Sequence, residues 1–182
     1  MKILIAFYSR TLITKSIAEQ IYELLENEHQ IELLQLSEKR KYHFLKLTIA
    51  PTKSGSYSIV LGSTRLFLDT IFKKTPRLEN ILIDVQKFDL LIIGSPIWYG
   101  RLPPAINTFI SNLKNIAPNK KTLIFVTSGV GKNYKKYPDL LKNELENIGL
   151  DVILKIHIDT VKASYLIKEH KKLILESIRS TF

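Results

Sequence analysis

The chain has 182 residues, of which 45% are hydrophobic and 24% are charged, and it contains no cysteine. This length and composition are typical of a globular protein, so the sequence predicts a single domain over residues 1–182 and does not favour a disordered chain. The absence of cysteine excludes disulfides, thiolate metal ligands and a cysteine nucleophile. The four histidines show no metal-ligand spacing, so no metal site is expected.

The formal net charge is +10, which favours an acidic partner: an acidic protein, a phosphorylated ligand, nucleic acid or a membrane surface. The apolar runs are too short to span a membrane, and residues 1–8 lack the layout of a signal peptide. We therefore expect a cytoplasmic protein. Nucleic acid is the least favoured partner, because the basic residues are not interleaved with aromatic ones.

The first part of the chain predicts a strand, a tight loop, a helix and a second strand. Residues 2–8 are an apolar run typical of a strand buried on both faces. Residues 12–27 carry isoleucine and leucine at helical spacing, with Thr11 available as the N-cap. Residues 30–36 have the composition of a second strand.

An extended connection follows at residues 37–80. Residues 51–58 are rich in Thr, Ser, Lys and Gly, so they predict a loop. Residues at about 60–73 predict a helix, which Pro76 would stop. This connection could cover a binding site or form a homodimer contact.

The rest of the chain alternates strands with helices. Strands are predicted at residues 87–95, 121–127 and 150–158, and helices at 103–115, 135–148 and 164–179. This alternation indicates an α/β fold with an open parallel sheet and helices on both faces. Ligands of such sheets bind beyond the carboxyl ends of the strands, so the loops at residues 9–15, 95–101 and 127–134 are the places to examine.

The first loop carries the hydroxyls of Ser9, Thr11 and Thr14 at the start of a helix. Free amides and the positive end of the helix dipole would make this loop a phosphate cradle. The alternative is a plain helix cap with spare hydroxyls.

The second loop holds Trp98, which is the only tryptophan, beside Tyr99. Two adjacent aromatic side chains exposed in a loop would stack on a flat ligand. The alternative is that Trp98 covers the edge of the core. In the third loop, Gly129 and Gly131 would let the backbone approach a planar ligand closely. Together the three loops fit a flavin mononucleotide.

These segments resemble those of a known family. FDLLIIGSPIWYGRLPPAINTFI at residues 88–110 and TSGVG at 127–131 are similar to the flavin loops of short flavodoxins. YSRTLITKSIA at 8–18 lies where that family carries its phosphate loop, [ST]-x-T-G-N-T. The chain resembles the flavodoxin-like superfamily along nearly its whole length. The resemblance implies a three-layer sandwich with a five-stranded parallel sheet of order 2-1-3-4-5.

The resemblance also implies FMN as the cofactor and assigns site residues. The phosphate positions are Ser9, Thr11 and Thr14, with backbone amides from Arg10 and Ile13. The positions beside the isoalloxazine ring are Pro96, Ile97, Trp98, Tyr99 and Gly100. The positions along its other edge are Thr127, Ser128, Gly129 and Gly131, with Tyr134 reaching toward the ring.

The leading hypothesis is an FMN-dependent redox protein in which the flavin does the chemistry and no side chain acts as a catalytic acid or base. It would be either an electron carrier between protein partners or a reductase that takes hydride from NAD(P)H and reduces a quinone. The family's Gly-Asn pair is Leu12-Ile13 here. This departure motivates the alternative, a flavodoxin-like domain that has lost FMN and serves as a binding or scaffold module.

Overall fold

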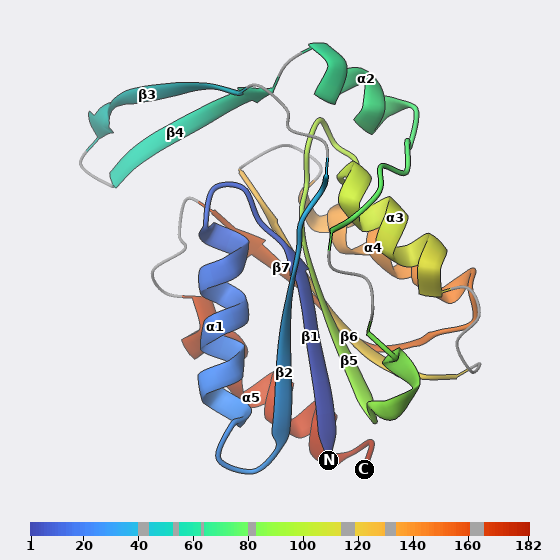
Figure 1. Ribbon diagram of the computed structural model, residues 1–182. Coiled ribbons are helices and arrows are strands. Elements are labelled where there is room, and N and C mark those ends of the chain that lie inside the picture. Colours follow the sequence, from blue (N-terminus) through green and yellow to red (C-terminus); the bar gives the residue numbers. More distant parts are fainter. Residues whose placement is uncertain are drawn as a thin grey trace.

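The computed structural model describes residues 1–39, 44–52, 55–62, 64–79, 83–113, 119–129, 134–160 and 166–182. Its centre is a parallel sheet of five strands in the order β2-β1-β5-β6-β7 (Figure 1). The strands are β1 (Lys2–Tyr8), β2 (Gln30–Leu36), β5 (Leu90–Pro96), β6 (Lys121–Ser128) and β7 (Asp151–Asp159). Strands β3 and β4 form a separate hairpin. When the five strands of the central sheet are numbered by themselves in chain order, their order is the expected 2-1-3-4-5, and the predicted fold class is confirmed.

Helices cover both faces of the sheet (Figure 1). Successive strand residues point to opposite faces, so an apolar strand such as β1 supplies two cores. Ile3, Ile5 and Phe7 pack under α1 (Ile13–Leu25) and α5 (Leu166–Arg179). Leu4, Ala6 and Tyr8 pack under α3 (Pro104–Asn112) and α4 (Tyr137–Glu146).

Most predicted elements occur within a few residues of their expected bounds. The helix expected from residue 135 begins as the short 3-10 helix η3 (Tyr134–Lys136) before α4, and η1 (Val85–Lys87) precedes β5. Two expected helix ends, residues 114–115 and 164–165, lie outside the described residues.

The connection between β2 and η1 differs from the prediction. The loop expected at residues 51–58 falls instead on two antiparallel strands, β3 (Phe44–Thr52) and β4 (Gly55–Gly62). The helix expected at 60–73 is shorter, α2 (Thr64–Ile71), because residues 60–62 belong to β4. The missed signal is the alternation of apolar and polar residues in FLKLT and SYSIVL, which has the period of a strand.

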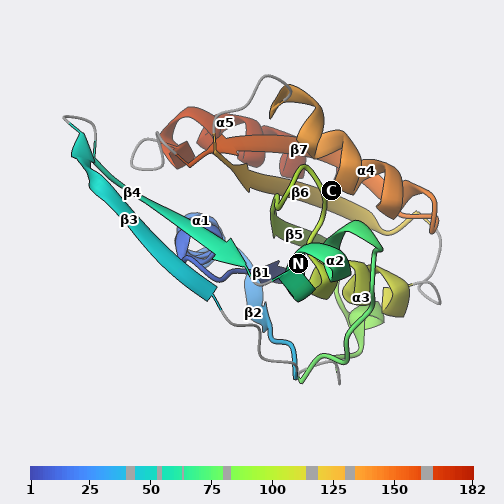
Figure 2. The same cartoon turned by 90° about the horizontal axis from the view of Figure 1, so that it is seen from above.

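Both ends of this inserted segment are tied together at its base. Glu38 and Leu78 form an isolated antiparallel bridge, the amide of Lys39 donates to the carbonyl of Arg77, and the amide of Glu79 donates to Ser37. The hairpin and α2 therefore leave the body from one point, near the carboxyl ends of the strands (Figures 1 and 2).

Candidate functional site

The three loops that the sequence singled out follow β1, β5 and β6, which are neighbours in the sheet. Thr127, at the end of β6, joins them. Its Oγ1 lies 2.8 Å from Oγ1 of Thr14 in α1, and both side chains are buried. Its carbonyl accepts the amide of Ile97 at 2.9 Å. The first and second loops are thus both fixed to the third, as the parallel order of the strands requires.

The first loop turns sharply into α1 at Leu12. This residue is the N-cap of the helix, with φ 67° and ψ −9°, and no side chain caps the helix. Its side chain is 64% exposed. A left-handed backbone is normally left to glycine, because a Cβ crowds the following carbonyl. Leucine therefore occupies the position of the family's glycine and adopts a glycine-like conformation.

The start of α1 offers several hydrogen-bond donors. The amides of the first helical turn have no partner within the helix, as at any helix start. The Oγ of Ser9 is buried and has no hydrogen-bond partner in the described part of the chain. Of the other predicted residues, Thr14 is buried and Thr11 is exposed. This arrangement suits an anionic group.

The partly exposed side chain of Arg10 forms a hydrogen-bonded network with Tyr8 and Glu38. Its Nε donates to the Tyr8 hydroxyl at 2.8 Å, and its Nη2 donates to Glu38 Oε2 at 3.1 Å. The Tyr8 hydroxyl also donates to Glu38 Oε2 at 3.2 Å. The Glu38 side chain is completely buried, although its sequence surroundings are charged, and nothing in the sequence pointed to it.

Burial sets the protonation behaviour of this network. It raises the pKa of Glu38 above its ordinary value, and the hydrogen bond and charge of Arg10 partly offset that rise. Burial, together with the charge of Glu38, also raises the pKa of the Tyr8 hydroxyl. Tyr8 therefore stays protonated near neutral pH, and Arg10 is the largest of the influences that favour the ionised form of Glu38, ahead of the hydrogen bonds from Tyr8 and the backbone of Ala105.

The second loop forms a tight turn at residues 98–101. The Trp98 amide donates to the Arg101 carbonyl at 2.9 Å, and the Arg101 amide donates to the Trp98 carbonyl at 2.8 Å. Tyr99 and Gly100 both have positive φ, 52° and 71°, as the two central residues of a type I′ turn require. The turn holds Tyr99 in an exposed position, with its ring edge-on to that of Phe67 in α2 at 5.1 Å.

Trp98 differs from its neighbour. It is half-buried, packs against the α3–α4 core, and lies edge-on to Tyr8 with 5.3 Å between ring centroids. The expected pair of exposed aromatic residues is therefore one exposed residue, Tyr99, and one core-edge residue. The indole of Trp98 has a larger apolar surface than the ring of Tyr99, so its burial stabilises the fold more.

The third loop begins with a second polar pair. Ser128 Oγ lies 2.8 Å from Nε2 of His157 in β7, and burial lowers the pKa of His157, opposed by the charge of Asp159. A Cβ added at Gly129 would meet only Thr160 Oγ1, at 3.8 Å. Gly131 and the side chain of Tyr134 lie outside the described residues. Sequence inspection missed His157, because only strand pairing brings it beside Ser128.

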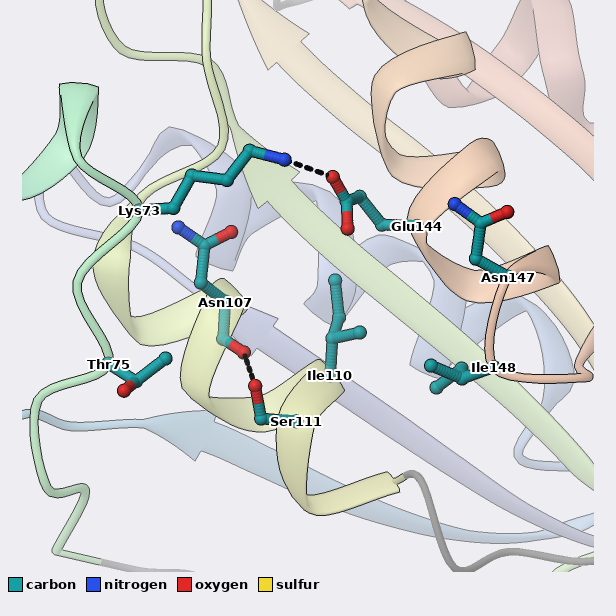
Figure 3. A pocket seen from close by; sticks show the side chains of 8 residues that line it. All are labelled: Lys73, Thr75, Asn107, Ile110, Ser111, Glu144, Asn147 and Ile148. Atoms are coloured by element: carbon teal, nitrogen blue, oxygen red, sulfur yellow. Dashed lines mark hydrogen bonds and ion pairs between the residues drawn. The ribbon is translucent and has the colours of Figure 1, made fainter.

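A separate hollow of about 300 Å³ lies between α3, α4 and the segment after α2 (Figure 3). An ion pair of 2.5 Å between Lys73 and Glu144 crosses it, and Ile110 and Ile148 line it. None of its lining residues belongs to the three loops. Within the described residues, no cluster of histidine and carboxylate side chains could hold a metal ion.

Comparison with known proteins decides the family. The sequence model of the flavodoxin family matches residues 2–156. The chain belongs to the flavodoxin family. None of the curated proteins compared with it matches. No helix in the described ranges is long and apolar enough to cross a membrane.

Several solved structures are similar to this chain. A flavoprotein from Lactobacillus acidophilus, solved in complex with FMN, is 26% identical, covers 92% of this chain and 97% of its own, and has a TM-score of 0.60. Flavodoxin 1 from Bacillus cereus is 17% identical over 98% of both chains, with a TM-score of 0.62. A flavoprotein from Bacteroides eggerthii is 21% identical over 98% of both chains, with a TM-score of 0.65. The latter two likenesses concern the fold.

Proposed function

We propose that this flavodoxin binds FMN and transfers electrons between protein partners. The observation that carries the proposal is the unpartnered, buried Oγ of Ser9 beside the free amides of α1, at the sheet edge where the Tyr99 turn also lies. A hydroxyl that finds no partner inside the protein is costly unless a ligand supplies one. The likeness to the Lactobacillus acidophilus flavoprotein, solved with FMN, is in keeping with a phosphate there.

The chain's residues would divide the work of holding the cofactor. The amides of residues 13–15 and Ser9 Oγ would bind the phosphate, and Thr14 would hold this loop against Thr127. The turn at Tyr99 and the backbone from residue 127 to Gly129 would flank the ring and exclude water from it. Bound FMN supplies electron-transfer chemistry that no amino-acid side chain provides.

FMN titration tests the proposal. FMN is expected to bind with its absorption and fluorescence changed, and riboflavin to bind roughly tenfold more weakly or worse, because charge-assisted hydrogen bonds are worth about 1.5–3 kcal/mol. Ser9→Ala is expected to weaken FMN binding several-fold while leaving the free energy of unfolding of the cofactor-free protein unchanged, since Ser9 Oγ has no partner within the described residues.

Ser16→Ala, at an exposed position in the first turn of α1, is the matched control and is expected to bind FMN as the wild type does. If FMN produces no spectral change at high concentration, the proposal is wrong. The domain is then a binding or scaffold module, which the strained Leu12 in the phosphate loop favours as the second candidate.

A second test concerns Leu12. Leu12→Gly is expected to raise the free energy of unfolding by about 1 kcal/mol, because it relieves a left-handed residue whose side chain is mostly exposed. It is also expected to tighten FMN binding, because it removes a side chain beside the proposed phosphate position. Urea denaturation and the same titration measure both effects.

Asn119→Gly is the control for this change, because Asn119 also has a positive φ, 65°, but lies at the start of β6, at the far end of the sheet. It is expected to leave FMN affinity unchanged. Equal effects of the two variants on FMN affinity would contradict the role of Leu12.

The carrier role is distinguished from the reductase role by turnover. The FMN-loaded protein is expected not to oxidise NADH or NADPH in the presence of a quinone. Steady oxidation of either would replace the carrier by an NAD(P)H-dependent reductase and would leave the FMN site itself unaffected.

A further inference from the structure

Helix α2 of the inserted segment and Phe72, which directly follows it, present apolar side chains to solvent. Phe67, Leu68 and Phe72 are exposed, Phe72 by 66%, and Tyr99 of the second loop adjoins them through its ring contact with Phe67. We call these four residues the α2 patch. Leu68 and Phe72 are one helical turn apart, since the Phe72 amide donates to the Leu68 carbonyl. Single exposed apolar residues are ordinary, whereas a group of large ones is typical of an interaction site.

The α2 patch is held in place by contacts on three sides. Leu66 and Thr70 of α2 point inward and are buried. The Lys73–Glu144 ion pair joins the end of α2 to α4, and the base of the insert is paired at Glu38 and Leu78. Figures 1 and 2 show α2 at the carboxyl end of the sheet, on the side of α3. A partner seated on the patch would therefore lie beside the second loop, at the end of the sheet that also carries the other two.

The backbone conformation of Tyr99 supports a functional role for its exposed ring. Its φ of 52° is a conformation that aromatic residues rarely adopt, and a glycine or asparagine would relieve it. A strained residue persists where the surroundings over-determine it, which is typical of functional positions. Tyrosine is also among the residues that contribute most to protein–protein interfaces.

The charges around the patch select the partner. The exposed cations are Arg65, Lys74, Arg77 and Arg101, and none of the four forms an ion pair within the described residues. Of the nearby carboxylates, Asp69 is buried and Glu144 is paired with Lys73, which leaves Glu79 exposed at the base of the insert. Two copies of this chain would bring these cations together, in a protein that already carries a net charge of +10.

We propose that the α2 patch docks an acidic redox protein whose carboxylates surround an apolar centre. The proposal rests on the electron-carrier function, because docking there would bring the partner's redox centre close to the proposed FMN site. Steering by the cations would speed association, and burial of Phe72 and Tyr99 would supply affinity.

Site-specific photocrosslinking in the native organism tests the docking. A benzophenone side chain placed at position 72 is expected to crosslink one acidic redox protein, identified by mass spectrometry. The same group at Leu173, an apolar position on α5 that is 48% exposed, is expected not to do so. The purified partner is then expected to bind the wild type with an affinity that falls steeply with salt, and to bind Phe72→Ser about tenfold more weakly.

Other outcomes overturn the proposal. They are a crosslink from position 72 to a second copy of the chain, to a basic protein, to nucleic acid or to lipid, equal crosslinking from positions 72 and 173, or no crosslink. FMN titration of Phe72→Ser separates the two proposals, because this variant is expected to keep wild-type FMN affinity. A protein that docks the acidic partner but ignores FMN would refute the carrier function and retain the surface.

Discussion

Arg10→Met is expected to lower the free energy of unfolding by about 2–3 kcal/mol at pH 7. The variant leaves the Glu38 carboxylate, whose side chain is completely buried, without the cation that hydrogen-bonds to it at 3.1 Å. The Arg10 side chain is 30% exposed, but its removal leaves an uncompensated charge on the buried Glu38, which is strongly destabilising. Glu38 can instead take up a proton, which at pH 7 costs about 3.5 kcal/mol for a carboxyl of ordinary pKa. This cost sets an upper limit on the loss of stability.

The raised pKa of Glu38 determines how the Arg10→Met defect changes with pH. Because burial raises the Glu38 pKa, the folded wild type binds a proton more tightly than the unfolded chain. The contribution of this group to stability is therefore greatest below the ordinary carboxyl pKa and falls as the pH rises toward the raised value. Without Arg10 the Glu38 pKa rises further, so in the variant the contribution of Glu38 to stability keeps falling up to a higher pH. The Arg10→Met defect is expected to shrink to about 1 kcal/mol or less at pH 5.

Urea denaturation at pH 5 and pH 7 measures the defect. The control is the double variant Arg10→Met/Glu38→Gln, in which the buried charge is removed together with its partner, and which is expected to regain much of the stability at pH 7. A defect that is equal at both pH values, with no recovery in the double variant, would show that Arg10 acts by packing alone.

Arg10 also shows where sequence inspection reaches its limit. The buried strands and the three loops could be predicted, because long apolar runs and loop positions follow from local pattern and topology. Glu38 could not, because a glutamate in a charged stretch is normally solvated. The register of β1 and β2, in which Tyr8 pairs with Leu36, brings Glu38 beside Arg10, and the pairing of residues 37–39 with 77–79 fixes this segment.

The insert shows a different limit. Its strands carried a readable alternation, but the Thr, Ser, Lys and Gly content around them favoured a loop. The position of α2 beside Tyr99 depends on a tertiary contact with Phe67, for which the sequence holds no local signal. The positions of the loops could therefore be predicted from the sequence, whereas the side-chain contacts made there could be predicted only in part.

Gly94→Ala is expected to lower the free energy of unfolding by about 3 kcal/mol, although it adds a single methyl group. Gly94 lies in β5 in register with Phe7 on one side and Phe125 on the other. A Cβ there would lie 2.7 and 2.8 Å from Cε1 and Cε2 of Phe125, and closer still to Cζ. The Phe125 ring is fully buried, so it has no space into which to move.

Two controls make this prediction specific. Gly129→Ala, at the end of β6, adds the same methyl group where the nearest atom is 3.8 Å away, and it is expected to change stability by less than about 0.5 kcal/mol. Phe125→Leu is destabilising by itself, because it leaves a cavity. In the Gly94→Ala background, however, it is expected to cost much less, because the added methyl group takes up part of the space of the ring. Strictly additive losses in urea denaturation would mean that the contact with Phe125 is not the cause.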